Sequence, residues 1–324
     1  MPSTFTTALF SPSAGDQSAT ISRLPELPEK DKSSLDVLKA HFGGPGYVLP
    51  VREGTKGDID ATITRLEACL VWRRTERVDD LEYMAQDCAA EARTGKNIVM
   101  GFSKHNQPII YFFPSRNSTP LEQRRVVHGI FMLERAYDLM PAGVTNTLVV
   151  FNFSGKRQGP PTSISAARQT IHILSAYYPE SLGVCIFQDM PWIVKGFVNL
   201  MWPFVDPVTK QKVKIGSSEG KEVIKDGYAD AGQVLREAGG DLDIPYDHDT
   251  YWPALLETSL KLRAEEETRW RALGERQVGR EERLFKRAAG GADIAHVMPT
   301  VIATGSDGAE SSATTSGEEH SDLD

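Results

Sequence analysis

The sequence predicts an α/β layer domain that follows a small bundle of helices. Short apolar runs typical of strands alternate with helical patterns between residues 96 and 187. Such alternation is typical of a layered α/β domain. Before it, a helix that starts near Asp58 repeats its apolar residues at helical spacing and ends at residues 72–74. The chain of 324 residues, 40% of them hydrophobic, is long enough to bury a sizeable core.

Each element of the predicted layer domain has its own pattern. Residues 97–101 and 108–113 are apolar runs separated by a polar stretch, which predicts a hairpin. Two helices with one apolar stripe each then alternate with two buried-type strands. The helices are expected over 121–140 and 163–178, and the strands over 147–153 and 183–187.

The two ends of the chain differ in composition from its centre. Residues 1–28 are expected to form a disordered arm, followed by a helical bundle over 29–90 and the α/β domain over 91–256. A charged helix, interpreted as a solvated helix that crosses the surface, is expected over 257–290. The tail, 291–324, is expected to be disordered and carries most of the net charge of −8.

Composition excludes several classes of protein. The three scattered cysteines lack metal-ligand spacing, which argues against a disulfide scaffold or zinc site and fits a reducing compartment. No basic stretch indicates nucleic-acid binding, and the N-terminus lacks the pattern of a signal peptide. No apolar run approaches the roughly 18 residues of a membrane span. We therefore expect a cytoplasmic protein that binds no nucleic acid.

No catalytic constellation stands out in the sequence. The histidines are scattered, a GxSxG motif is absent, and residues 216–221 (GSSEGK) lack the spacing of a phosphate loop. Cys185 lies in an apolar strand and is interpreted as a packing residue. We therefore expect a protein that is not an enzyme, with no catalytic residues, metal or cofactor.

Residues 192–205 (WIVKGFVNLMWPFV) carry the clearest functional signal, because ten of these fourteen residues are apolar. Pro191 stands where a helix can begin. A helix that is apolar almost all round is buried or faces lipid, and at roughly 21 Å it is too short to cross a hydrocarbon core of roughly 30 Å. One interpretation is a core helix. The other is a movable lid, made flexible by Gly196, that covers an apolar cavity and faces a membrane when open.

The next stretch, PFVDPVTKQKVKI at 203–215, leaves its conformation open. A helical turn would place Thr209 and Lys212 on one side, whereas a strand would align Lys210, Lys212 and Lys214. The stretch is accordingly either a solvated lysine edge or an anion site, since lysine supplies a compact positive charge for phosphate.

Seven short motifs occur in a fixed order along the chain. They are WRR at 72–74, GFSKHNQPIIYFFP at 101–114, LVVFNFSG at 148–155, YYPESLGV at 177–184, MPWIVKGF at 190–197, PFVDPVTKQK at 203–212 and YDHDTYWP at 246–253. Together they resemble the CRAL-TRIO lipid-binding family, especially its fungal phosphatidylinositol transfer proteins. The resemblance implies a helical bundle followed by a CRAL-TRIO α/β domain, in which a mixed sheet floors an apolar lipid cavity and a helix near 191–204 gates it.

The resemblance also implies a function and the residues that carry it. The protein would bind phosphatidylinositol or another phospholipid, and would transfer it between membranes or present it to a lipid kinase. A second phospholipid or a sterol would be a further ligand. The contact with membranes would be transient and peripheral, at the endoplasmic reticulum or another organelle surface. The phosphoinositol head group would be bound by Lys56, Glu180, Thr209 and Lys212, and the gate would face the membrane through Trp192, Ile193, Gly196, Phe197, Leu200 and Met201.

Two segments depart from the pattern of that family. Its LRxLRAxK motif stands here as LPVREGTK at 49–56, which keeps the first leucine and the final Lys56, and its DFSG motif is NFSG at 152–155. These departures concern the head group more than the fold, so two alternatives stay open. The same fold would carry or sense a sterol, an isoprenoid or haem, or the chain would be an adaptor that binds a partner through residues 257–287 and the acidic tail.

Overall fold

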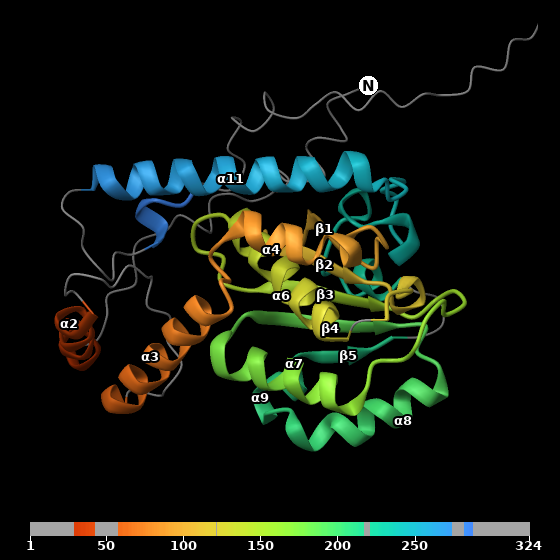
Figure 1. The fold of residues 1–324 in the computed structure, drawn as a ribbon, viewed down its shortest axis with the longest axis horizontal. Helices are drawn as coiled ribbons and strands as arrows, with labels where there is room; N and C mark the ends of the chain where they lie inside the picture. Colours follow the sequence, from red (N-terminus) through yellow and green to blue (C-terminus); the bar gives the residue numbers. More distant parts are fainter. Residues whose placement is uncertain (1–28, 43–57, 121, 217–220, 274–281, 288–324) are drawn as a thin grey trace, which may run out of the picture.

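A five-stranded mixed sheet lies at the centre of the computed structural model, which describes residues 29–42, 58–120, 122–216, 221–273 and 282–287 (Figure 1). The strands lie side by side in chain order. The first pair is antiparallel, and the other three pairs are parallel. The strands are β1 (Asn97–Phe102), β2 (Pro108–Phe112), β3 (Thr147–Asn152), β4 (Leu182–Gln188) and β5 (Val213–Ile215).

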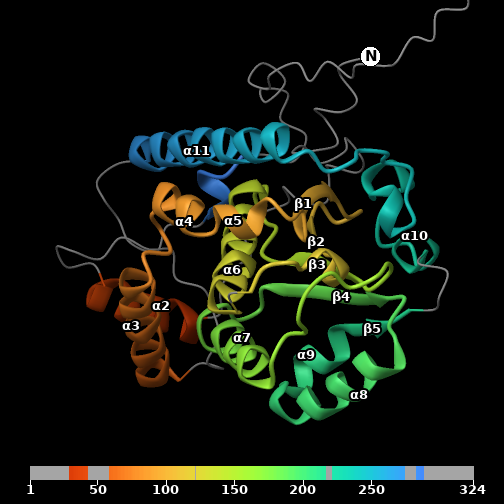
Figure 2. The ribbon, with the colours of Figure 1, turned by 45° about the vertical axis from the view of Figure 1, so that its right-hand side comes forward.

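Two crossover helices cover one face of the sheet. Helix α6 (Glu122–Leu139) joins β2 to β3, and α7 (Ile164–Tyr177) joins β3 to β4. Crossovers between parallel neighbours are right-handed, which places successive helices on the same face, and α6 and α7 do lie in contact there (Figures 1 and 2). The mixed α/β class predicted from the sequence is thereby confirmed, including the β1–β2 hairpin.

The opposite face of the sheet is covered by the chain between residues 222 and 246. This segment includes α10 (Glu222–Lys225) and the short helices η3 (Ala231–Gln233) and η4 (Arg236–Ala238). Two amides in the sheet hold it: Asn152 Nδ2 donates to the carbonyl oxygen of Glu237 at 2.8 Å, and Gln188 Nε2 donates to that of Ala238 at 3.2 Å. Because all these groups are paired inside the protein, the cover is fixed to the sheet.

Side chains bond three backbone groups of the outer strand β1. The Tyr251 hydroxyl accepts a hydrogen bond from the Val99 N–H at 2.8 Å and donates to the Val99 carbonyl at 3.0 Å. The N–H of Phe102 donates to Gln233 Oε1 at 3.0 Å. Unpaired edge strands attract further strands, so these bonds protect the sheet from pairing with another chain. They also give Tyr251, the second tyrosine of the YDHDTYWP motif, a structural role.

One long helix, α11 (His248–Ala272), runs along the outside of α6 (Figure 1). The charged helix expected from residue 257 therefore begins already at His248. Its interpretation as a solvated surface helix is wrong for the first part, where Thr258, Ser259 and Leu262 are buried, whereas none of residues 263–272 is buried. The Nε of Arg263 donates to Asp138 Oδ1 on α6 at 2.7 Å, and several side chains of α11 are buried: Tyr251, Trp252, Ala254, Leu255, Thr258, Ser259 and Leu262. The described segment after it holds η5 (Glu282–Leu284).

The N-terminal part of the described chain is helical, as predicted. Its helices are α2 (Glu29–Phe42), α3 (Ile59–Thr75), α4 (Leu81–Asp87) and α5 (Ala89–Ala92). The WRR motif at the end of α3 binds this region to the layer domain. The ring of Trp72 stacks on that of Tyr177 at the end of α7, with centroids 4.4 Å apart. None of the helices in the described ranges is long and apolar enough to span a bilayer.

Arg73 forms the central ion pair between these two parts. Its Nη1 and Nη2 donate to Oε1 and Oε2 of Glu134 on α6 at 2.8 and 3.0 Å. The Tyr178 hydroxyl donates to the same Oε1 at 2.6 Å. Burial disfavours the charged carboxylate, but Arg73 and Tyr178 outweigh it and hold the pKa of Glu134 below its usual value. Glu134 thus stays ionised inside the protein because its charge is fully paired.

Neutralising this buried carboxylate is expected to destabilise the protein. Glu134→Gln keeps the shape but removes the buried charge that pairs with Arg73, which is then left with only the more exposed Asp79 as a charged partner. We therefore expect a loss of about 3 kcal/mol in the free energy of unfolding. Urea unfolding followed by circular dichroism measures the loss. The control is Glu267→Gln, which breaks the exposed Arg271–Glu267 pair and is expected to cost less than about 1 kcal/mol. Equal effects of the two variants would contradict the central role of Glu134.

A buried histidine is expected to make stability depend on pH. His128 is fully buried on α6, its Nδ1 is paired with Asn97 Nδ2 at 3.2 Å, and burial lowers its pKa to about 3. The unfolded chain therefore binds the proton more readily, and stability falls as the pH drops below about 6.5. Between pH 7 and pH 5 we expect a loss of about 2 kcal/mol from this residue.

Urea unfolding at several pH values tests the contribution of His128. His128→Gln is expected to flatten the dependence on pH, whatever its stability at pH 7. The matched control, His172→Gln, replaces an exposed histidine on α7 and should leave the slope as it is. An unchanged slope in His128→Gln would show that other groups cause the acid sensitivity.

Candidate functional site

The stretch that the sequence left open is a short helix, α9 (Pro207–Lys212). Asp206 begins it, since its Oδ1 accepts the N–H of Thr209 at 2.8 Å, and Pro207 occupies the first helical position. Residues three apart on a helix lie on the same side. The helix therefore places Thr209 and Lys212 on one side, as the helical alternative predicted, and the Thr209 side chain also bonds the Asp206 carboxylate.

Glu180 lies opposite Lys212, at the amino ends of the strands. Glu180 comes two residues before β4, and Lys212 comes directly before β5, which pairs with β4 in parallel. The Lys212 Nζ donates to Glu180 Oε2 at 2.8 Å. The side chain of Lys212 is 23% exposed and that of Glu180 is 66% exposed, so both are open to a ligand from solvent.

The backbone holds Glu180 in an unusual conformation. Its φ is +56°, in the left-handed region that favours glycine. A hydrogen bond across the turn stabilises it: the Ser181 hydroxyl donates to the carbonyl oxygen of Tyr178 at 2.7 Å. Strain of this kind persists where the surrounding structure holds it, and it is common at binding sites. The turn aims the carboxylate at Lys212.

This arrangement has a defined chemical capacity. The ammonium of Lys212 is held by one carboxylate and retains two further N–H donors for a phosphate oxygen. Glu180 accepts hydrogen bonds and suits a ligand that carries hydroxyl groups. Lys56, the fourth predicted head-group residue, lies outside the described residues. The structure thus brings together Glu180 and Lys212, with Thr209 on the same helix as Lys212.

The departure at 152–155 has a structural explanation. Asn152 uses both ends of its amide: Nδ2 donates to the Glu237 carbonyl, and Oδ1 accepts the Ser154 N–H at 2.8 Å. A carboxylate at this position cannot donate the first of these bonds. In this chain, residue 152 therefore holds the fixed cover of the sheet.

A row of phenylalanines on the sheet was missed by the sequence analysis. Phe112, Phe151 and Phe187 occupy the same register on β2, β3 and β4. The ring centroids are 4.6 Å apart between Phe112 and Phe151, and 5.1 Å between Phe151 and Phe187. All three are half-buried although β3 lies in the middle of the sheet. The three rings lie on the face of the sheet that α6 covers. This follows from Asn97, which pairs with Phe112 across the strands and bonds to His128 of α6.

Residues 192–204 form α8 (Trp192–Met201) and the short helix η2 (Trp202–Phe204). Val194 and Met201 are its buried residues, seven positions apart, so Met201 faces inward in this structure. Trp192 is 80% exposed, and Ile193, Gly196 and Leu200 are exposed as well, whereas Phe197 is half-buried. The helix therefore presents an apolar surface beyond the part that it buries.

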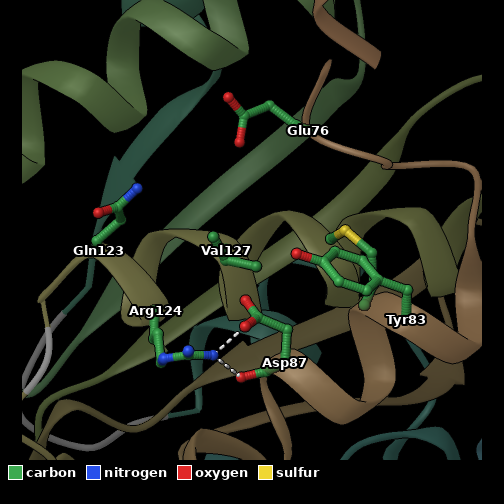
Figure 3. A pocket seen from close by; sticks show the side chains of 7 residues that line it. Glu76, Tyr83, Asp87, Gln123, Arg124 and Val127 are labelled. Carbon is green, nitrogen blue, oxygen red and sulfur yellow. Dashed lines mark hydrogen bonds and ion pairs between the residues drawn. The ribbon is translucent and has the colours of Figure 1, made fainter. Parts of the chain in front are cut away.

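A separate pocket of about 350 Å³ lies between the end of α3, α4 and α6 (Figure 3). Its lining is largely polar, and Arg124 forms an ion pair with Asp87 inside it. None of the predicted head-group and gate residues within the described ranges lines it. Its lining residues are Glu76, Tyr83, Met84, Asp87, Gln123, Arg124 and Val127. This pocket suits a polar group and does not match an acyl chain.

The described residues offer no candidate metal centre. No group of three or more histidine, cysteine or acidic side chains is placed there to hold a metal ion. Cys88 and Cys185 are buried, and burial raises the pKa of each thiol to about 12. A thiol with so high a pKa is a poor nucleophile and metal ligand.

Comparison with known proteins gives the class of the domain. Residues 92–240 match the CRAL/TRIO domain family, and this range contains the sheet, Glu180, Thr209, Lys212 and α8. Residues 92–240 therefore form a CRAL/TRIO domain.

Three curated relatives come from fungi. A CRAL-TRIO domain-containing protein of Schizosaccharomyces pombe is 31% identical over 255 residues, which are 79% of this chain and 24% of that protein. The phosphatidylinositol transfer protein PDR17 of Saccharomyces cerevisiae is 30% identical over 60% of this chain and 57% of its own. The phosphatidylinositol transfer protein CSR1 of Eremothecium gossypii is 23% identical over 59% and 46%. The chain thus spans between 24% and 57% of the length of these relatives.

A solved structure, that of Sfh5, overlaps 58% of this chain and 66% of its own. The TM-score is 0.43 at 18% sequence identity, a likeness too distant to carry an argument.

The left-handed conformation of Glu180 leads to a prediction about stability. Glycine adopts φ of +56° without strain, whereas alanine does not. Both Glu180→Gly and Glu180→Ala remove the ion pair with Lys212, so their difference isolates the backbone. We expect the glycine variant to be about 1 kcal/mol more stable than the alanine variant in urea unfolding. A more stable alanine variant would mean that residue 180 is not held in the left-handed region in solution.

Proposed function

We propose that this chain binds one phosphatidylinositol molecule at a time and transfers it between membranes. The observation that carries the proposal is the ion pair between Lys212 and Glu180, 2.8 Å long and open to solvent, beside Thr209 in a CRAL/TRIO domain. Two relatives named as phosphatidylinositol transfer proteins support the same ligand.

The head group would use the three described polar residues. Lys212 would contribute charge to the phosphate, and the Thr209 hydroxyl on the same side of α9 would add a neutral hydrogen bond. Glu180 would accept hydrogen bonds from inositol hydroxyls. Lys56 would supply a second positive charge. Charge-assisted bonds of this kind are the strong ones, and a phosphate held near apolar chains requires them.

The acyl chains would lie against the phenylalanine row of Phe112, Phe151 and Phe187. Each buried CH₂ group is worth about 0.8 kcal/mol, so two exposed lipid chains would cost on the order of 20 kcal/mol in water. A carrier must therefore enclose them. Half-buried rings in the middle of a sheet are suited to be the floor of such a space, and the apolar helix α8 is suited to be its lid.

Opening of this lid would occur at a membrane, where lipid satisfies its apolar side chains. Trp192, Ile193, Gly196, Phe197 and Leu200 would face the membrane, and Met201 would join them once α8 lifts. The protein would be cytoplasmic and would touch the endoplasmic reticulum or another organelle surface only briefly. Delivery to a lipid kinase and a second phospholipid or sterol ligand belong to the same proposal.

Native mass spectrometry with lipid extraction tests the ligand directly. Protein purified from a eukaryotic host is expected to carry close to one phosphatidylinositol per chain. A sterol, an isoprenoid or haem in its place would refute phosphatidylinositol as the ligand while leaving the fold as described.

The contribution of Lys212 is tested by a transfer assay between donor and acceptor vesicles. Removing a charge-assisted bond to phosphate costs about 1.5 kcal/mol or more, so Lys212→Ala is expected to lower phosphatidylinositol transfer at least about tenfold. Lys225→Ala is the matched control, because it removes an exposed lysine of α10, on the opposite face of the sheet. Lys56→Ala combined with Lys212→Ala is expected to abolish transfer while the circular dichroism stays unchanged. Equal losses in Lys225→Ala and Lys212→Ala would refute the assigned site.

A further inference from the structure

Helices α8 and α9 lie together at the end of the molecule opposite α11 (Figures 1 and 2). Between residues 192 and 208, large apolar side chains are exposed to an unusual extent. Trp192 is 80% exposed, and Ile193, Leu200, Phe204 and Val208 are between 47% and 61% exposed. We call these five residues the α8–α9 face.

The charge around this face opposes that of the whole chain. The net charge of the protein is −8, but residues 190–215 contain four lysines and a single carboxylate side chain, Asp206. Asp206 is engaged at the start of α9, and Lys212 is paired with Glu180. Lys195 and Lys214 are exposed and Lys210 is half-buried. An apolar surface with tryptophan and lysines around it matches a lipid surface that carries negative charge.

A contact between an arginine and an aromatic ring links this face to α7. The guanidinium carbon of Arg168, on α7, lies 4.4 Å from the centroid of the Phe204 ring. Both side chains are exposed, so the contact is accessible from outside. Arginine stacks on aromatic rings and also binds phosphate with two parallel hydrogen bonds. Arg168 is thus placed to exchange one of these partners for the other.

We propose that the α8–α9 face docks on an anionic membrane, and that Arg168 leaves the Phe204 ring for a lipid phosphate during docking. The exchange frees η2 and the adjoining end of α8, which then opens. The inference rests on the lipid-binding function proposed above and adds which membranes are used and what releases the lid. It also extends the membrane contact beyond α8, to Phe204 and Val208.

Vesicle flotation of the full chain tests the docking step. Wild-type protein is expected to bind vesicles of phosphatidylcholine with phosphatidylserine more tightly than vesicles of phosphatidylcholine alone, and salt should remove the difference. One arginine near an anionic surface contributes about fivefold in affinity, so Arg168→Gln is expected to lose about that factor. Arg271→Gln, on α11, is the matched control and should keep the affinity of the wild type for these vesicles. Equal binding to both vesicles, or equal losses in the two variants, would overturn the proposal.

Hydrogen exchange of residues 198–205 without vesicles tests the release step. Arg168→Lys keeps the charge but loses the planar stacking group. It is expected to bind anionic vesicles within about twofold of wild type, while exchange of these residues speeds up as it does in Arg168→Gln. Unchanged exchange in both variants would refute the contact with Phe204 as the latch. Native mass spectrometry of the same samples shows whether phosphatidylinositol is bound, which separates a failure of this inference from a failure of the lipid-binding function.

Discussion

The bidentate ion pair between Arg73 and Glu134 is the contact on which the arrangement of the protein depends. It joins α3 to α6, and Tyr178 adds the end of α7 to the same carboxylate. One turn further along α6, Arg263 of α11 binds Asp138. A buried carboxylate that loses its partner is costly. Any arrangement that separates these helices would leave such a charge unpaired, so the pairs select one packing of the helical region against the sheet.

The same contact positions the candidate site. Tyr178 belongs to the YYPE turn, and its hydroxyl is bound to Glu134 while Tyr177 stacks on Trp72. Glu180 follows two residues later in the left-handed conformation. Because the start of the turn is anchored by two contacts, its far end is held in a fixed direction. The WRR and YYPE motifs, far apart in the sequence, therefore act together to aim one carboxylate at Lys212.

Local pattern predicted most of the elements, whereas long-range pairing escaped it. The hairpin, both crossover helices and the helix at 192–201 follow from apolar spacing, and the family resemblance assigned Glu180 and Lys212 to one site. The helix at 207–212 could have been predicted from the sequence. Asp206 and Pro207 are a helix start signal, and this signal outweighs the strand-like alternation of the lysines. The phenylalanine row needed the register between parallel strands, which no short motif specifies. The sequence analysis did not predict the packing of α11 on α6, because Asp138, the partner of Arg263, lies more than a hundred residues earlier in the chain.

The molecule separates a fixed part from a part that has few anchors. The pairs around Glu134 hold α3, α6, α7 and α11, and the segment 231–240 is bonded to the sheet through Asn152 and Gln188. Helix α8, in contrast, buries only Val194 and Met201, so lifting it would leave the buried ion pairs intact. Lys212 stands where the two parts meet, at the last residue of α9 and the position before β5. A phosphate bound to Lys212 would share the ammonium with the Glu180 carboxylate, so an anionic ligand would act directly on the junction between the two parts.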